Sequence, residues 1–431
     1  MSNQPEESLI KVFQTKEVFV AGGIPNNTYN PRQNSHVEQE MDRFLEDSGK
    51  ILNIYGASKS GKTCLVERKL PRDTCIWIQG QEINSLQDFW EKLGYRLSVE
   101  ASRIKSRSTT EALQESGRFT AGIPRVIQGE IGSSDTSTYG TDEKEEYSTD
   151  FPSRVRENLA QRRLPIVIDD FHYISDDCRV SIVRALKSIV RESPVILVAV
   201  PSSAFDVVAA ESEMRGRVWT LEVPPWSLAE LTEISARGFE LLNLEDPRGA
   251  AGQLAHSSYA SPFIMQQLCL DLVRWENNIR ETVNPKKTIT LPDDFPDFLT
   301  RSAERSKWDI LSRLLEGRKG SGRVTLTLAG HEGTTDIYGA VLVALRDVGS
   351  GMAVSERAIF NKVKELCNEP IQGPQVTNAL SGMSKIAAQE SKGWDPALRY
   401  VPADAYQDAK VFIEDSGFSF YLHHGNWSPI K

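Results

Sequence analysis

At residues 56–63 the chain reads Gly56-Ala57-Ser58-Lys59-Ser60-Gly61-Lys62-Thr63. This stretch lies between an apolar run at residues 51–55 and a predicted helix at residues 62–69. In a strand–loop–helix context, the two glycines let successive backbone N–H groups point inward at phosphate oxygens. The spacing predicts that Lys62 reaches the β- and γ-phosphates and that Thr63 offers a hydroxyl to Mg²⁺. The chain is therefore expected to bind a nucleoside triphosphate here, with Cys64 adjoining the site.

A second motif follows about 100 residues later, where residues 164–170 read LPIVIDD. A short apolar run that ends in two carboxylates is typical of a buried parallel strand whose carboxyl end carries acidic groups. In this Walker B position, Asp169 is expected to hold the Mg²⁺ shell, usually through water, and Asp170 to orient or deprotonate the attacking water. The alternative is a surface pair of acids that ends a core strand.

Composition agrees with a globular protein of several domains. The 431 residues predict two to four domains, with 39% hydrophobic and 25% charged residues. No apolar run approaches the roughly 20 residues that span a bilayer, and the first residues, MSNQPEESLIK, lack a secretion-signal pattern, so a cytoplasmic location is expected. The net charge of −9 argues against attraction of the whole protein to nucleic acid or to a membrane. The scattered cysteines suggest neither disulfides nor a zinc site.

The order of predicted elements indicates an α/β fold, a P-loop NTPase with a doubly wound parallel sheet. Strands are expected at residues 51–55, 74–78, 164–169, 195–200 and 217–223. Helices are expected at residues 37–45, 62–69, 85–99, 151–161, 176–192 and 205–213. A polar insertion at about residues 101–150 interrupts them and suits a lid, a docking loop or disorder.

Beyond Pro224-Pro225 the strands are expected to stop, which predicts an all-α lid followed by a winged-helix-like domain. Lid helices are expected near residues 227–243, 247–256, 262–277 and 294–316. The last unit has predicted helices at 336–347, 355–366 and 375–389, two short strands at 398–401 and 410–414, and an aromatic run at 418–421. The predicted domains are residues 1–50 (N-terminal, adenine-contacting segment and helix), 51–225 (P-loop core), 226–316 (lid) and 317–431 (winged-helix-like).

These motifs resemble those of the STAND-type signalling ATPases of the AAA+ class, which are related to NACHT and NB-ARC switches and to origin-recognition ATPases. The stretch at residues 168–174, IDDFHYI, resembles the Walker B strand and tail of the maltotriose-responsive activators in this group. Residues 217–228, RVWTLEVPPWSL, resemble the last core strand and the start of the lid. The resemblance implies that Pro262, in Ala260-Ser261-Pro262, touches the nucleotide from the lid, and that residues 20–32 cradle the adenine of ATP.

The chain also departs from the family pattern. Many AAA+ enzymes end Walker B in Asp-Glu, so the shorter Asp170 implies slow hydrolysis. After the strand ending at Val200, Pro-Ser-Ser-Ala replaces Thr-Thr-Arg, which leaves Ser202 or Ser203 as the γ-phosphate sensor. The nearest cations, Arg215 and Arg217, are expected either to contact phosphate, in the same chain or in a neighbour, or to form surface salt bridges. Ala260 replaces the lid glycine, and His172 is read either as a hydrogen-bond partner near Asp170 or as a structural residue.

The predicted function is a slowly hydrolysing, Mg²⁺-dependent ATP switch that engages a separate effector or sensor protein, with nucleotide-dependent self-assembly as a hypothesis. By family analogy alone, a bacterial stress or anti-phage module is the favoured setting. One alternative is a DNA-binding initiator or regulator. Residues 353–392 carry five basic and four acidic residues, a net of +1, and the predicted recognition helix has one charged residue, Lys385, so nucleic acid is not favoured. The other alternative is an ATP-binding scaffold without turnover.

Overall fold

The structure is a computed structural model that describes residues 11–47, 49–99, 103–104, 146–147, 151–200, 216–305, 309–317, 323–330, 332–348, 353–390, 396–403 and 408–430. The helix predicted at residues 205–213 lies outside the described residues, as do Ser202, Ser203, Arg215 and nearly all of the insertion at 101–150. None of the helices in the described part of the chain combines the length and hydrophobicity needed to cross a membrane.

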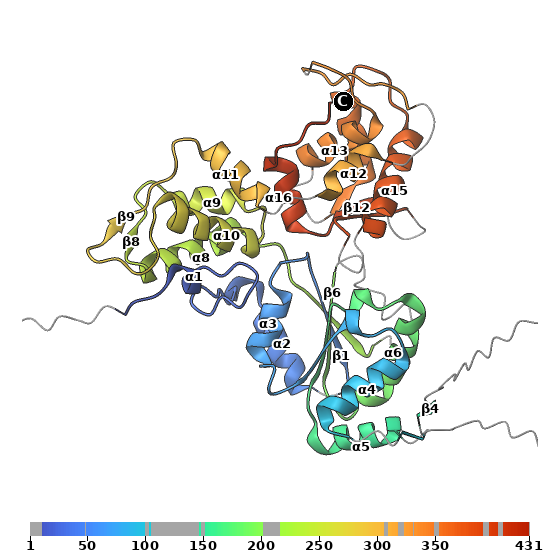
Figure 1. Ribbon diagram of the computed structural model, residues 1–431. Helices are drawn as coiled ribbons and strands as arrows, with labels where there is room; N and C mark the ends of the chain where they lie inside the picture. The colour runs from blue at the N-terminus through green and yellow to red at the C-terminus, as the bar shows by residue number, and fades with distance from the viewer. Residues whose placement is uncertain are drawn as a thin grey trace, which may run out of the picture.

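The described residues between 33 and 223 form a sheet domain around five parallel strands in the order β2-β5-β6-β1-β7 (Figure 1). The strands are β1 (Ile51–Tyr55), β2 (Ile76–Gln79), β5 (Ile166–Asp169), β6 (Val195–Ala199) and β7 (Val218–Glu222). The register aligns Ile51 with Val195 on one side and with Val218 on the other. This parallel sheet with helices on both faces confirms the predicted P-loop NTPase fold class.

The two faces of the sheet explain why its strands are apolar at nearly every position. Along β1, Leu52 and Ile54 pack on one face, whereas Ile51 packs on the other. The first face is covered by α2 (Val37–Glu46) and α3 (Lys62–Lys69). The second face is covered by α4 (Leu86–Leu97), α5 (Phe151–Arg162) and α6 (Asp176–Ile189). Alternate residues therefore enter two separate cores, as expected for a doubly covered parallel sheet.

Short elements complete this domain. They are η1 (Gln33–Ser35), η2 (Gly80–Glu82), η3 (Phe171–Tyr173) and the antiparallel pair β3 (Arg103–Ile104) and β4 (Glu146–Tyr147). Because β3 and β4 pair, the two chain ends that flank residues 105–145 lie next to each other.

Residues 11–32 and 224–305 form a helical domain. It contains α1 (Thr15–Val18), α8 (Leu228–Leu241), α9 (Ala250–Ser257), α10 (Pro262–Asp271), the π-helical turn η6 (Leu272–Glu276) and α11 (Phe295–Glu304). The N-terminal segment belongs to its core: Phe19 is fully buried and meets Phe239 edge to face, with ring centroids 6.0 Å apart. The prediction that strands stop after Pro225 is wrong in one detail, because β8 (Leu244–Glu245) pairs with β9 (Lys287–Thr288).

The described residues between 309 and 430 form a C-terminal domain. Its elements are α12 (Asp309–Glu316), α13 (Ile337–Val348), β10 (Ala353–Ser355), α14 (Glu356–Leu366), α15 (Gly373–Glu390), β11 (Leu398–Val401), β12 (Lys410–Ile413) and α16 (Ser416–His424). The sheet has three antiparallel strands in the order β10-β12-β11, not the two predicted. The helix predicted at residues 294–316 is two helices, and α12 packs on α13 and α15. The aromatic run at 418–421 lies inside α16.

The helical and C-terminal domains lie side by side beyond one end of the sheet domain, and α16 lies between them (Figure 1). Both contribute to one continuous apolar core, in which Leu268 of α10, Phe298 of α11 and Phe418 of α16 are all buried. The sheet domain keeps its two cores to itself. Apolar burial therefore joins the helical and C-terminal domains to each other more firmly than it joins either to the sheet domain.

Candidate functional site

The loop at residues 56–61 joins β1 to α3 with the backbone that the motif predicts. Gly61 precedes α3 with φ of +94°, in the left-handed region that favours glycine. Gly56 has no room for a side chain, because a Cβ atom would lie 2.7 Å from the carbonyl oxygen of Val223. The glycines thus serve a turn and a close approach, and the loop curls at the amino end of α3. Backbone N–H groups at such a position favour anions.

Lys62 is 7% exposed, and its ammonium group stays inside the loop. Its Nζ donates hydrogen bonds to the carbonyl oxygens of Gly56 and Ala57, each 2.8 Å away. Phosphate oxygens would compete with these two carbonyl groups for the same donor. Contact between Lys62 and the β- and γ-phosphates stays a prediction.

Thr63 and Asp169 meet at the carboxyl edge of the sheet. The Thr63 hydroxyl lies 3.2 Å from each carboxylate oxygen of Asp169, although 106 residues separate the two. Burial first, and then the charge of Asp170, raises the pKa of Asp169 to about 6. A hydroxyl beside a buried carboxylate is a donor set that suits Mg²⁺, and a cation would relieve the repulsion between the two acids. The residues present therefore fit the predicted metal.

Asp170 leaves β5 in the left-handed conformation, with φ of 55° and ψ of 43°, and lines the same cavity as the loop. Its carbonyl oxygen would be only 2.3 Å from a Cβ atom on Gly80, so the end of β2 has room for this turn only because residue 80 is glycine. His172 lies close to the ring of Tyr173, with centroids 4.3 Å apart, and both interpretations of His172 stay predictions. The catalytic role of Asp170 stays a prediction.

A cavity of about 390 Å³ unites the loop with two other segments. One is the predicted adenine-contacting segment, which contributes residues 22–25 and 28–32. The other is the start of α10, which contributes Pro262, Phe263 and Gln266. The volume lies in the range of small-molecule and cofactor sites. The structure thus brings together the loop, residues 20–32 and Pro262, and binding of a nucleotide by them stays a prediction.

The turn before α10 contains Ala260, where the family pattern has glycine. Ala260 has φ of +55°, a left-handed conformation that glycine adopts with less strain. Ser261 follows as the N-cap residue and accepts a hydrogen bond from the Ile264 N–H (3.4 Å). Pro262 occupies the first turn, where its missing N–H is harmless. The backbone therefore keeps the turn despite Ala260.

Cys64 lies at the rim of the same cavity and links α3 to the N-terminal segment. Its Sγ atom donates to the carbonyl oxygen of Gly23 at 3.7 Å. Burial, followed by the charges of Glu67 and Asp169, raises the pKa of the Cys64 thiol. The thiol is therefore a neutral neighbour of the cavity at pH 7.

Arg217 does not lie at this site. Its carbonyl oxygen accepts a hydrogen bond from the Ile51 N–H (2.8 Å), at the amino ends of the parallel strands. The loop follows Tyr55 at the opposite end of β1, about 13 Å away at about 3.3 Å per strand residue. The predicted phosphate contact of Arg217 within the same chain is therefore wrong. A contact with a neighbouring molecule stays a prediction.

Sequence reasoning missed Arg32 and Trp226 as a pair. Arg32 is buried, donates to the carbonyl oxygens of Pro224 (2.9 Å) and Pro225 (3.0 Å), and forms an ion pair with Glu230 (3.0 Å). Its guanidinium carbon lies 4.6 Å from the ring centroid of Trp226, whose Nε1 donates to the Ser60 carbonyl oxygen (2.9 Å). This pair ties the N-terminal segment, the start of the helical domain and the loop together.

No protein-family model matches the sequence, and no curated protein matches it at a significant level. Solved structures do match. A Walker-type ATPase of Pyrococcus abyssi is 14% identical with a TM-score of 0.50, over 90% of this chain and 95% of that one. The ORC2 protein of Aeropyrum pernix is 12% identical with a TM-score of 0.48, over 96% of this chain and 97% of that one.

A STAND protein of Pyrococcus horikoshii with a tetratricopeptide-repeat sensor is 12% identical with a TM-score of 0.35, over 84% of this chain and 46% of that one. At identities this low, the likenesses concern the fold alone. The chain has a P-loop NTPase fold, which it shares with the Walker-type ATPase of Pyrococcus abyssi.

Proposed function

We propose that this protein is an ATP-dependent molecular switch that binds ATP with Mg²⁺ and hydrolyses it slowly. The observation that carries the proposal is the position of the Thr63 hydroxyl, 3.2 Å from both carboxylate oxygens of Asp169, beside a loop whose backbone N–H groups lie at the amino end of α3. One motif would hold the phosphates and the other the metal. They come from separate parts of the sequence and meet in one cavity.

Each residue has a distinct part in the proposed reaction. The loop amides and Lys62 hold the phosphates, and Thr63 and Asp169 hold Mg²⁺. When bound, the metal supplies positive charge that offsets the charge developing on the transferred phosphoryl group. Asp170 orients the attacking water or accepts its proton. Its side chain is one methylene shorter than the glutamate of many AAA+ enzymes, which makes slow turnover the expected behaviour.

The proposal of a switch rests on which domains line the cavity. Residues of the sheet domain and of the helical domain both line the cavity, so a bound nucleotide would contact both. A ligand shifts a conformational equilibrium by its difference in affinity for the two states. Nucleotide state would then set how the domains engage a separate effector or sensor protein. Self-assembly with ATP, a bacterial stress or anti-phage setting and a cytoplasmic location remain predictions at this level.

DNA binding is the second candidate function, and the order of elements in the C-terminal domain is the observation that favours it. Helix, strand, helix, helix and two strands, from α13 to β12, is the order of a winged helix, so we retain that assignment as a proposal. Against DNA binding, α15 carries Lys385 as its one basic residue. A steep loss of DNA affinity between low and physiological salt would support this candidate.

Calorimetry with ATP and Mg²⁺ tests the proposed function. The wild type should release or take up heat on binding, and Lys62→Ala should lower the affinity by about a hundredfold, which corresponds to about 2.7 kcal/mol. Lys50→Ala is the matched control, because Lys50 precedes the same strand at its other end and is 41% exposed. Absence of binding by the wild type would remove the proposal.

Single-turnover hydrolysis then separates the switch from a scaffold. The wild type should turn ATP over slowly and Asp170→Ala more slowly still, whereas equal and negligible rates would favour the scaffold. Sedimentation of the wild type with ATP or ADP, and of Lys62→Ala with ATP, tests self-assembly. If all three samples stay monomeric, nucleotide-dependent assembly is excluded.

A further inference from the structure

The junction between β12 and α16 touches the phosphate-binding loop directly. Ser58 donates its backbone N–H to the carbonyl oxygen of Glu414 (2.9 Å) and forms a parallel β-bridge with Asp415. The Lys59 ammonium group lies 2.8 Å from the Asp415 carboxylate, across 356 residues of sequence. Residues 413–416, which we call the acidic corner, thus occupy a backbone donor and a cation of the loop.

The acidic corner is built firmly into the C-terminal domain. Asp415 is the N-cap residue of α16 and accepts hydrogen bonds from the backbone N–H groups of Gly417 (2.6 Å) and Phe418 (3.2 Å). Glu414 is 2% exposed and Asp415 is 7% exposed. The Ser416 hydroxyl lies 2.9 Å from that of Ser261, next to Pro262 of the cavity wall. The corner therefore connects the C-terminal domain both to the loop and to the start of α10.

The loop partner of this contact is held as well. Besides the Asp415 carboxylate, the Lys59 ammonium group faces the ring of Phe263, with the nitrogen 5.0 Å from the centroid. Lys59 has φ of +61°, so the backbone of the loop turns sharply at the residue that makes the ion pair. Phe263 lines the cavity, and the ion pair therefore lies at its wall.

A polyphosphate and the acidic corner carry charge of the same sign and would use the same loop. ATP brings several negative charges, and the Asp415 carboxylate beside it at low exposure would raise its free energy through repulsion that solvent screens poorly. Lys59 can serve the phosphates fully only when Asp415 no longer holds it. The following inference rests on the proposed function. We propose that the acidic corner acts as a latch, which means that polyphosphate binding to the loop and docking of residues 413–416 on the same loop oppose each other. ATP would then withdraw the β12–α16 corner from the sheet domain.

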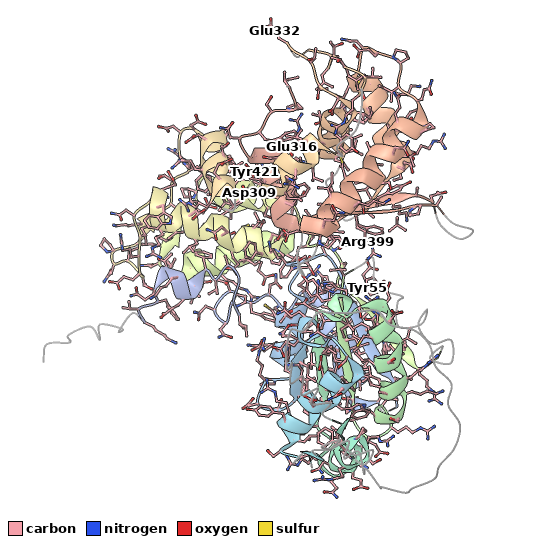
Figure 2. All side chains as sticks on the ribbon, turned by 45° about the vertical axis from the view of Figure 1, so that its right-hand side comes forward. Tyr55, Asp309, Glu316, Glu332, Arg399 and Tyr421 are labelled. Atoms are coloured by element: carbon pink, nitrogen blue, oxygen red, sulfur yellow. The ribbon has the colours of Figure 1, made fainter. Side chains whose placement is uncertain are left out.

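The domain arrangement makes such a withdrawal inexpensive. The contact between the corner and the loop is polar, whereas α16 is held by the apolar core that it shares with α10 and α11. In Figure 2, Arg399 lies on the end of the C-terminal domain that faces the sheet domain, and Tyr55 lies on the end of the sheet domain that faces it. Breaking this junction would expose little apolar surface, so a ligand with modest differential affinity would suffice to open it.

Asp415→Asn is the decisive variant. Asparagine is as good an N-cap residue as aspartate, so α16 keeps its cap, but the negative charge is lost. Calorimetric titration with ATP and Mg²⁺ should show about tenfold tighter binding than for the wild type. Asp294→Asn is the matched control, because Asp294 caps α11 in the same way, accepting from the Asp297 N–H (2.9 Å), and should leave the affinity unchanged.

Hydrogen–deuterium exchange of residues 408–424 provides a second readout that does not depend on affinity. ATP should speed exchange in the wild type, and Asp415→Asn and Lys59→Gln should each speed it without ATP. The latch is overturned if ATP slows exchange there, or if Asp415→Asn binds ATP no more tightly than the wild type. If neither protein binds ATP, the proposed function fails together with the latch, whereas ATP binding of equal strength removes the latch alone.

Discussion

The buried charge of Asp169 lowers the stability of the ligand-free protein but favours the binding of a cation. Asp169 is 3% exposed, and Asp170 follows it directly, so burial and like charge raise the pKa of Asp169 to about 6. At pH 7 the folded protein holds a charge that it would keep more easily in water. Bound Mg²⁺ would offset that cost, because its positive charge compensates the buried carboxylate. The unfavourable charge of Asp169 in the free protein therefore increases the affinity for a cation.

We predict opposite effects of Asp169→Asn on stability and on metal-dependent binding. Without metal, the free energy of unfolding of the variant should exceed that of the wild type by on the order of 1 kcal/mol at pH 7.5, because the buried charge is gone. The increase in ATP affinity that Mg²⁺ gives the wild type should be lost. Urea unfolding without metal and calorimetry with Mg²⁺ or with a chelator measure the two effects.

Asp170→Asn is the control for this pair of measurements, because it removes the neighbouring charge and leaves the predicted metal ligand in place. It should retain most of the metal-dependent increase in affinity. Equal loss of that increase in both variants would mean that Asp169 has no special role at the metal.

Whether a residue of the site could be predicted from the sequence depends on how far it lies from its partners along the chain. Lys62 and Thr63 belong to one contiguous motif, and Asp169 ends an apolar strand, so local patterns were enough to predict them. Arg32 and Asp415 have no such local pattern. Arg32 contacts Pro224 across 192 residues, and Asp415 pairs with Lys59 across 356. Such pairs depend on how domains pack, which no periodicity within a segment encodes.

At the level of elements, the N-terminal segment is fixed to the helical domain by a side chain that needs a glycine. A Cβ atom on Gly238 in α8 would lie 2.2 Å from the ring of Phe19, which is fully buried. Phe19 directly precedes residues 20–32, which line the cavity. The packing of one element therefore positions a predicted binding segment in another.

We predict that Gly238→Ala destabilises the protein by about 1–3 kcal/mol, because the added methyl group forces the Phe19 ring out of place. The midpoint of urea unfolding measures this effect. Gly252→Ala is the matched control: Gly252 lies in α9, and apart from its own helix backbone and chain neighbours no atom lies within 4 Å of an added Cβ. It should stabilise by about 0.5–1 kcal/mol, since alanine favours helix over glycine. Shifts in the same direction for both variants would contradict this account.

Element boundaries were predictable where a pattern was long. The strand at residues 51–55 and the helix at 62–69 coincide with β1 and α3, because burial on two faces and amphipathic spacing run through them. Strands of two or three residues, such as β8, β9 and β10, are too short to show a period. Helix α16 was missed because its residues 417–422 are all buried, so no polar face marks it as a helix.

For the whole molecule, α16 is the element through which the domains meet. At its amino end Asp415 contacts the loop of the sheet domain, and at its carboxyl end His424 contacts the helical domain. The Tyr259 hydroxyl lies 3.1 Å from Nε2 of His424, and the Tyr259 ring also lies near His423, with centroids 4.3 Å apart. A change at either end of α16 therefore acts on a contact between domains.

The carboxyl-end contact should depend on pH. Burial, with a smaller contribution from the charge of His423, lowers the pKa of His424 from 6.5 to about 4. Between these two values the unfolded chain binds more protons than the folded protein, so stability falls as the pH falls. In the tautomer that leaves Nε2 without a proton, Nε2 accepts a hydrogen bond from the Tyr259 hydroxyl, and protonation would remove the lone pair that it uses. The stability that neutral His424 contributes is therefore complete above about pH 6.5 and is lost as the pH falls towards 4.

We predict that lowering the pH from 7.5 to 5 costs the wild type on the order of 1–2 kcal/mol more than it costs His424→Gln, after allowance for partial exposure of the ring. Glutamine does not titrate but can still accept the Tyr259 hydrogen bond, so the variant should differ chiefly in its pH dependence. Urea unfolding at the two pH values measures the difference. His256→Gln, at an exposed position in α9, is the control and should follow the wild type. If His424→Gln loses as much stability as the wild type on acidification, His424 is not the titrating group at this contact, and the acid response of the molecule lies elsewhere than at α16.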